Sequence, residues 1–257
     1  MRKARTWTQS DVIAGPGIGH AFDAAPRPSA RTLGAQALQS PPAVADEFQN
    51  LTLPTEHGPI QARLFDAGST KSGAVFVGRC ANTFDSPANG LYARLGLDLS
   101  RSGVTCLWVR HRDPLDLATA TESLRSAIGA LTGRGIARIA LVGHALGARA
   151  AMRAADSARE VRTVVTLALD AASPEALAHL GQRAILFVHG TADEVAAPST
   201  SVELHRLARE PKELRLIDGA GHCLDESPGT VHLLVRAWLE RWLASDVIPI
   251  PILRNLG

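Results

Sequence analysis

Three short segments of the sequence carry residue types and spacings typical of nucleophilic catalysis. Gly143-His144-Ala145-Leu146-Gly147 has the glycine spacing of a nucleophile elbow, the sharp strand-to-helix turn that presents a catalytic serine. An alanine, Ala145, stands where that serine belongs. Asp193 and His222 follow later in the chain, so the order is nucleophile position, acid and histidine. The pattern predicts a triad that lacks its nucleophile.

The elements that must position these residues alternate between strands and helices. Helical spacing of apolar residues appears in 117–131 and 231–242, and the alanine-rich stretch after Gly147 continues the elbow as a helix. We expect an α/β fold with a mostly parallel, twisted sheet of about eight strands, helices on both faces and no large lid. The apolar runs that predict the strands are 47–53, 60–65, 73–78, 104–110, 138–143, 161–169, 184–190 and 212–218.

The pattern within these runs also predicts how the strands pair. Runs 47–53 and 60–65 alternate polar and apolar residues, as an antiparallel edge hairpin does, whereas the later runs are almost continuously apolar. Ligands of parallel α/β sheets bind at the carboxyl ends of the strands. Because the elbow, Asp193 and His222 each follow such a strand, we expect them to meet at that edge.

From about residue 47 to 243 the chain resembles the α/β-hydrolase fold family, and its organisation is closest to the small lidless dienelactone-hydrolase-like and carboxylesterase-like members. "HGTADEVAAP" (189–198) resembles the acid loop of that family, and "IDGAGHCLDES" (217–227) resembles its histidine loop. The resemblance implies hydrolysis of an ester or lactone, with Asp193 orienting His222 and His222 acting as the base. Asp170, which directly follows the run 161–169, is the rival acid with the poorer loop match.

Ala145 limits what this site can do. Loss of a triad nucleophile costs on the order of a millionfold in rate, so no acyl-enzyme is expected at residue 145. Three explanations stay open: an engineered serine-to-alanine change, natural loss in a non-catalytic member, or a relocated nucleophile at Cys80 or Cys223. The alternative function is a non-catalytic ligand-binding or protein-interaction module on the same fold.

The predicted oxyanion hole departs from the family. The backbone N–H of Leu146 is the expected first donor, and that of Cys80 or Arg79 is the expected second donor. Family members usually have a His-Gly pair at the end of the strand at 73–78, where this chain has Gly78 followed by Arg79.

Cationic residues are expected to flank the mouth of the site and to contact a substrate. They would favour a carboxylate or phosphate on the ligand, unless Asp85, Asp113 and Asp116 neutralise them in surface pairs. The predicted substrate-binding residues are Arg79, Arg110, His111 and His144.

The composition of the chain argues against several other classes of function. The 257 residues are 46% hydrophobic and 20% charged with a net charge of +2, which indicates a globular domain and no nucleic-acid partner. Three cysteines without a C-x-x-C pair favour a reducing, cytoplasmic location, and no stretch predicts a membrane span. No dinucleotide, phosphate-loop or metal-ligand pattern occurs, so we expect no cofactor and no metal.

The composition also divides the chain into three parts. We expect a flexible leader at 1–45, a hydrolase domain at 46–245, and an apolar, proline-rich tail at 246–257 that docks on the domain or on a partner. No feature indicates the oligomeric state.

Overall fold

A computed structural model of the protein describes residues 47–80, 82–113, 116–170 and 174–244. The predicted leader and tail lie outside these ranges. Within them, no helix is both long and apolar enough to cross a membrane.

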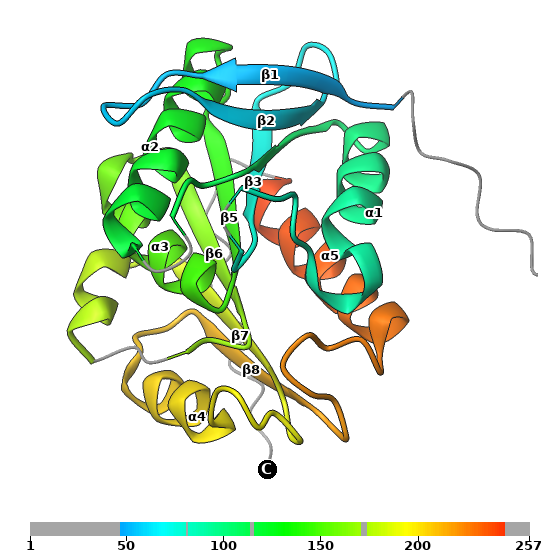
Figure 1. The fold of residues 1–257 in the computed structure, drawn as a ribbon, viewed down its shortest axis with the longest axis vertical. Helices are drawn as coiled ribbons and strands as arrows, with labels where there is room; N and C mark the ends of the chain where they lie inside the picture. Colours follow the sequence, from blue (N-terminus) through cyan, green and yellow to red (C-terminus); the bar gives the residue numbers. More distant parts are fainter. Residues whose placement is uncertain (1–46, 81, 114–115, 171–173, 245–257) are drawn as a thin grey trace, which may run out of the picture. The chain divides into compact units, whose positions relative to one another are not determined.

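Eight strands form one sheet with the order β1-β2-β4-β3-β5-β6-β7-β8 (Figure 1). β1 pairs antiparallel with β2, and β2 pairs antiparallel with β4. All the remaining neighbours are parallel, which confirms the predicted mostly parallel sheet with an antiparallel hairpin at its edge. The strands are β1 (Gln49–Leu53), β2 (Ile60–Phe65), β3 (Ser72–Val77), β4 (Val104–Val109), β5 (Arg138–His144), β6 (Val161–Leu167), β7 (Ala184–Gly190) and β8 (Lys212–Ile217).

Helices cover both faces of the sheet, as predicted. α1 and α5 pack on one face, and α2 and α3 pack on the other (Figure 1). The helices are α1 (Pro87–Arg101), α2 (Leu117–Gly133), α3 (Leu146–Ala154), α4 (Pro198–Leu207) and α5 (Pro228–Leu243), with short 3-10 turns η1 (Ala155–Ser157) and η2 (Pro174–Leu180). Since η2 is the one helix in the described part of the segment between β6 and β7, no large lid is present there.

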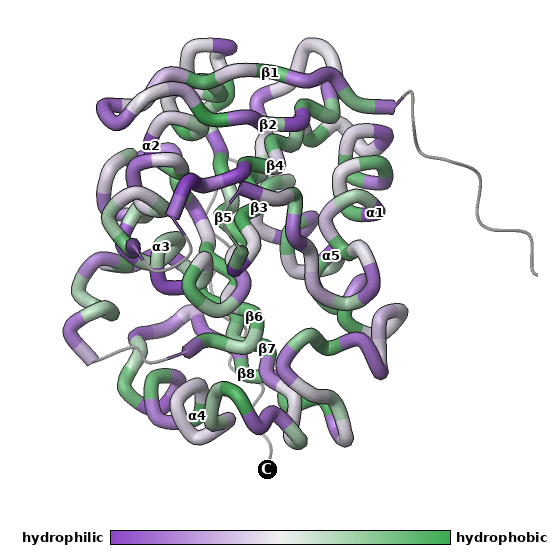
Figure 2. Tube along the Cα trace, viewed as in Figure 1, coloured by the Kyte–Doolittle hydropathy of each residue, from purple (hydrophilic) through white to green (hydrophobic). Residues whose placement is uncertain are grey.

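The two-residue period of the strands divides the core into two layers. In β3, Ala74 and Phe76 pack with α1 and α5, whereas Val75 and Val77 pack with α2 and α3. Both layers are buried, so the central strands are apolar on both faces. Figure 2 shows the hydrophobic colouring along much of these strands. Burial of this area supplies the main stabilisation of the fold.

The predicted strand boundaries hold to within two residues. The largest differences, of two residues, are at run 47–53, because β1 begins at Gln49, and at run 161–169, because β6 ends at Leu167. Ala168 has a φ of 45°, in the left-handed region, and therefore leaves the strand conformation.

Candidate active site

The elbow between β5 and α3 is present. Ala145 has φ 51° and ψ −115°, a backbone conformation that non-glycine residues adopt at a cost of about 1–3 kcal/mol. Its two glycines allow the close approach: a Cβ on Gly143 would collide with the carbonyl of Gly147, and a Cβ on Gly147 would lie 2.6 Å from the oxygen of Gly78. The turn therefore holds a buried methyl group in the backbone conformation predicted for a nucleophile.

Asp193 and His222 form a hydrogen-bonded pair. Asp193 follows β7 and His222 follows β8, two neighbouring parallel strands, so their loops lie at the same edge of the sheet. The Nδ1 atom of His222 lies 2.9 Å from Oδ2 of Asp193, and both side chains are buried. The distance fits an Nδ1–H that donates to the carboxylate and leaves Nε2 as the proton acceptor.

Four donors hold the Asp193 carboxylate. Oδ1 accepts from the N–H groups of Val195 and Ala196 at 2.9 and 2.8 Å, and Oδ2 faces the two imidazoles of His222 and His189. Burial by itself would raise the pKa of Asp193, but the hydrogen bonds from Ala196 and His222 outweigh it and lower the pKa. The acid is therefore ionised and fixed in orientation at neutral pH.

His189 is the donor that the sequence analysis missed. Its Nε2 lies 3.1 Å from Oδ2 of Asp193 and 3.0 Å from the carbonyl of Ala196. Both of these partners accept hydrogen bonds, so Nε2 carries the proton, and Nδ1, 2.7 Å from Oγ of Ser201, accepts from that hydroxyl. The signal in the sequence was a histidine in the buried end of a strand, four residues before the acid.

His144 links the elbow to the histidine loop. Its ring is buried, and its Nε2 lies 3.0 Å from the backbone carbonyl of His222. Burial lowers the pKa of His144 to about 4, so at neutral pH the uncharged ring donates Nε2–H to that carbonyl. This contact places Ala145, the next residue in the chain, on the side of the sheet that carries His222. Contact between His144 and a substrate stays a prediction.

The N–H groups predicted as oxyanion donors differ in their surroundings. Leu146 begins α3, and N–H groups in a first helical turn have no acceptor within their helix. The N–H groups of Arg79 and Cys80, in contrast, both donate to Oδ2 of Asp85, at 3.0 and 3.3 Å. A carboxylate of the chain itself therefore holds both of the predicted second donors.

The predicted cationic mouth is largely occupied by contacts within the chain. Nε of Arg79 lies 3.9 Å from Oδ2 of Asp85, and the guanidinium of Arg110 lies over the ring of Phe84. His111 is buried, its Nδ1 is 2.9 Å from the carbonyl of Asp113, and burial lowers its pKa. The Arg79 contact fits the alternative in which acidic neighbours neutralise the cations.

The rival acid Asp170 pairs with an arginine and not with His222. Its Oδ1 lies 2.7 Å from Nε of Arg149, and no hydrogen bond joins it to His222 within the part of the chain that the structure describes. The geometry thus pairs Asp193, and not Asp170, with the histidine.

The two candidate thiols are half-buried near the same edge of the sheet. Burial raises the pKa of Cys223, although nearby Arg79 opposes this shift. No hydrogen bond joins the thiol of Cys80 or Cys223 to His222 among the described residues. The guanidinium of Arg79 is the cationic neighbour of both thiols, so a histidine-activated thiol finds no support in the described residues.

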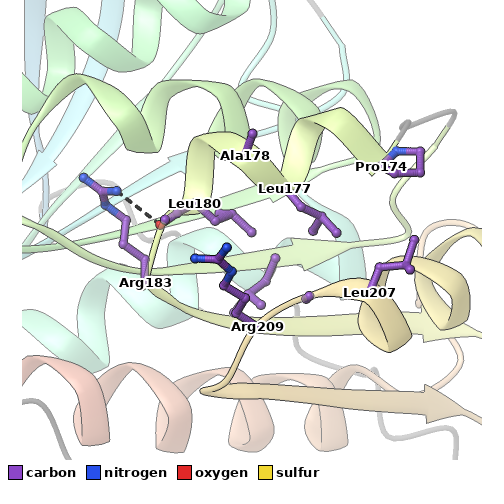
Figure 3. A pocket seen from close by; sticks show the side chains of 10 residues that line it. Pro174, Leu177, Ala178, Leu180, Arg183, Leu207 and Arg209 are labelled. Atoms are coloured by element: carbon purple, nitrogen blue, oxygen red, sulfur yellow. Dashed lines mark hydrogen bonds between the residues drawn. The ribbon is translucent and has the colours of Figure 1, made fainter.

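A separate cavity of about 470 Å³ lies between η2 and α4 (Figure 3). Its lining includes Leu177, Leu207 and Ile185, and Ile185 belongs to the amino-terminal part of β7. Because Asp193 follows the carboxyl end of the same strand, this cavity is distinct from the Asp193–His222 site.

Comparison with known proteins identifies the fold. By sequence, no family model and no curated protein matches this chain. By structure, the esterase domain of a Rhodothermus marinus protein matches with a TM-score of 0.61 at 21% identity, over 76% of this chain and 99% of that one. Est1E from Butyrivibrio proteoclasticus matches with a TM-score of 0.67 at 15% identity, over 76% and 99% of the two chains.

A dienelactone hydrolase from Anabaena variabilis also matches, with a TM-score of 0.65 at 19% identity, over 77% of this chain and 99% of that one. Structural similarity at these sequence identities establishes the fold and does not establish the function. The chain has the α/β-hydrolase fold that the sequence analysis predicted.

Proposed function

We propose that this chain carries the site of an ester or lactone hydrolase from which the nucleophile is missing. In this proposal it binds a small ester, lactone or carboxylate and forms no acyl-enzyme. The observation that carries the proposal is the buried hydrogen bond between Asp193 and His222, because a carboxylate with four donors serves to orient an imidazole. Two of the similar structures, an esterase domain and a dienelactone hydrolase, belong to this class of enzyme.

The roles of the residues follow from their atoms. A hydroxyl at position 145 would give its proton to Nε2 of His222, while Asp193 stabilises the imidazolium through Nδ1–H. The methyl group of Ala145 has no proton to give and no lone pair to attack with. Turnover through residue 145 is therefore absent, and binding is what the site retains.

Restoring the serine tests the proposal. We expect Ala145→Ser to react with a fluorophosphonate probe and to hydrolyse p-nitrophenyl esters, because the strained turn and the Asp193–His222 pair are already in place. The control is Ala145→Ser combined with His222→Ala, which should abolish labelling. Asp193→Asn in the same background should lower the rate by about 10⁴-fold, as loss of the orienting acid does in serine proteases.

The alternative, a non-catalytic ligand-binding or interaction module, is favoured by Ala145 itself. It predicts that Ala145→Ser stays folded, with an unchanged circular dichroism spectrum, yet reacts with neither probe nor ester. That result would contradict the hydrolase proposal, since a restored nucleophile beside a working base must react.

A further inference from the structure

The side chain of Asp85 binds the backbone that directly follows β3. It lies in the segment that joins β3 to α1, and its Oδ2 accepts hydrogen bonds from two successive backbone N–H groups, those of Arg79 and Cys80. The distances are 3.0 and 3.3 Å, and the side chain is 22% exposed. Successive N–H groups that converge on one oxygen form an anion-binding cradle. Here the anion is part of the chain.

This cradle lies beside the elbow. The first turn of α3 packs so closely on the end of β3 that a Cβ on Gly147 would lie 2.7 Å from the carbonyl oxygen of Val77. Arg79 follows Val77 by two residues, so its N–H lies at the same edge of the sheet as the N–H of Leu146. A ligand oxygen bound between the two segments would need the donors that Asp85 now holds.

We propose that Asp85 competes with ligands for the backbone N–H groups of Arg79 and Cys80 and thereby controls which ligands bind at the site. This inference rests on the proposed function in one respect, that the elbow is the ligand site. An oxyanion or small carboxylate binds the N–H groups of Arg79 and Cys80 only after Asp85 has left them. A carboxylate tethered so close competes at an effective concentration in the millimolar range or above. A neutral ester or lactone does not face this competition when it binds through Leu146 alone, but the oxyanion that forms on nucleophilic attack does.

The charge around Asp85 supports the same conclusion. Nε of Arg79 lies 3.9 Å from the oxygen that holds the cradle, so the nearest guanidinium is compensated by Asp85 as well. A second carboxylate brought here meets Asp85 as a like charge at short range. Displacement of Asp85 would free both N–H groups for a ligand and would leave the guanidinium of Arg79 without its carboxylate neighbour.

Neighbouring contacts hold the segment on both sides of Asp85. The ring of Phe84 packs edge-on against Trp108 with centroids 5.3 Å apart, and Oγ of Ser86 accepts from the N–H of Tyr92 at 2.9 Å. Substitution of Asp85 therefore removes the carboxylate while these two anchors remain.

The test uses butyrate and the chain with Ala145 in place, followed by amide chemical shifts in NMR. In the unaltered chain we expect millimolar butyrate to leave the amides of Arg79 and Cys80 unshifted. Asp85→Ala should bind butyrate about tenfold to a hundredfold more tightly, with the largest shifts at these two amides, because two hydrogen bonds to a charged group become available. Asp85→Asn keeps an acceptor oxygen for both N–H groups and should gain less.

The outcomes separate the explanations. Equal gains in Asp85→Ala and Asp85→Asn would mean that charge repulsion alone matters, and would overturn the proposed competition for the N–H groups. So would tight binding of butyrate by the unaltered chain. Asp66→Ala, a matched loss of one negative charge beside Arg134 at the opposite edge of the sheet, should change nothing.

A second measurement links the inference to activity. In the Ala145→Ser background, Asp85→Ala should raise the rate of fluorophosphonate labelling, and a lower rate would show that Asp85 supports the site instead. If Ala145→Ser reacts with no probe at all, the proposed function fails, while the butyrate titration still tests Asp85.

Discussion

His189 is a buried side chain that holds the carboxylate of Asp193 in place. Its Nε2–H is one of two donors on the Asp193 oxygen that also faces His222, and Ser201 on α4 holds its other nitrogen. It is fully buried, and burial lowers its pKa, so it is neutral at physiological pH. We regard His189 as a positioning residue for the acid.

Substitutions at His189 test this role in the Ala145→Ser background. His189→Leu removes a donor from a buried carboxylate and should lower the free energy of unfolding by about 1–3 kcal/mol, together with the labelling rate. His189→Gln, whose amide nitrogen can replace Nε2, should restore the rate in part. If both variants lose stability equally but label as fast as the parent, the role of His189 is structural only.

The strands and the elbow were predictable because their signals are local. Continuous apolar runs identify strands buried on both faces, and the glycines around Ala145 identify a turn that tolerates no Cβ at Gly143 or Gly147. The contact of Asp85 with the N–H of Arg79 was not predictable, since it depends on how a six-residue segment turns back on its strand. Side-chain burial also could not be read from the sequence: His111, predicted at the mouth, and His144, predicted to bind substrate, are both buried.

The packing of β3 on α3 gives a prediction about Gly147. Gly147→Ala should lower the free energy of unfolding by about 1–3 kcal/mol, because the new methyl group must displace the carbonyls of Gly78 and Val77. Gly129→Ala, in the exposed middle of α2 where a Cβ meets nothing, should instead raise it by about 0.4–1 kcal/mol. Urea unfolding of both variants measures the difference, and equal effects would refute the close packing at the elbow.

For the described molecule as a whole, buried histidines couple folding to pH. Burial lowers the pKa of His111, His144 and His189, so the folded state disfavours their protonation. A histidine in the unfolded chain takes up its proton near pH 6.5, whereas His144 in the folded chain does so near pH 4. Between these values the unfolded chain binds more protons, so stability is full above pH 6.5 and falls as the pH is lowered toward 4.

His144 alone should contribute roughly 3 kcal/mol of this loss, since each unit of pKa shift corresponds to about 1.4 kcal/mol. Urea unfolding at a series of pH values measures the slope, and His144→Gln, which keeps a donor but does not titrate, should flatten it. The depressed pKa of Asp193 acts at lower pH, where its stabilisation is lost as the carboxylate is protonated. A slope unchanged by His144→Gln would show that burial does not hold this ring neutral. It would then contradict the assignment of an uncharged His144 that donates Nε2–H to the carbonyl of His222 and so links the elbow to the histidine loop.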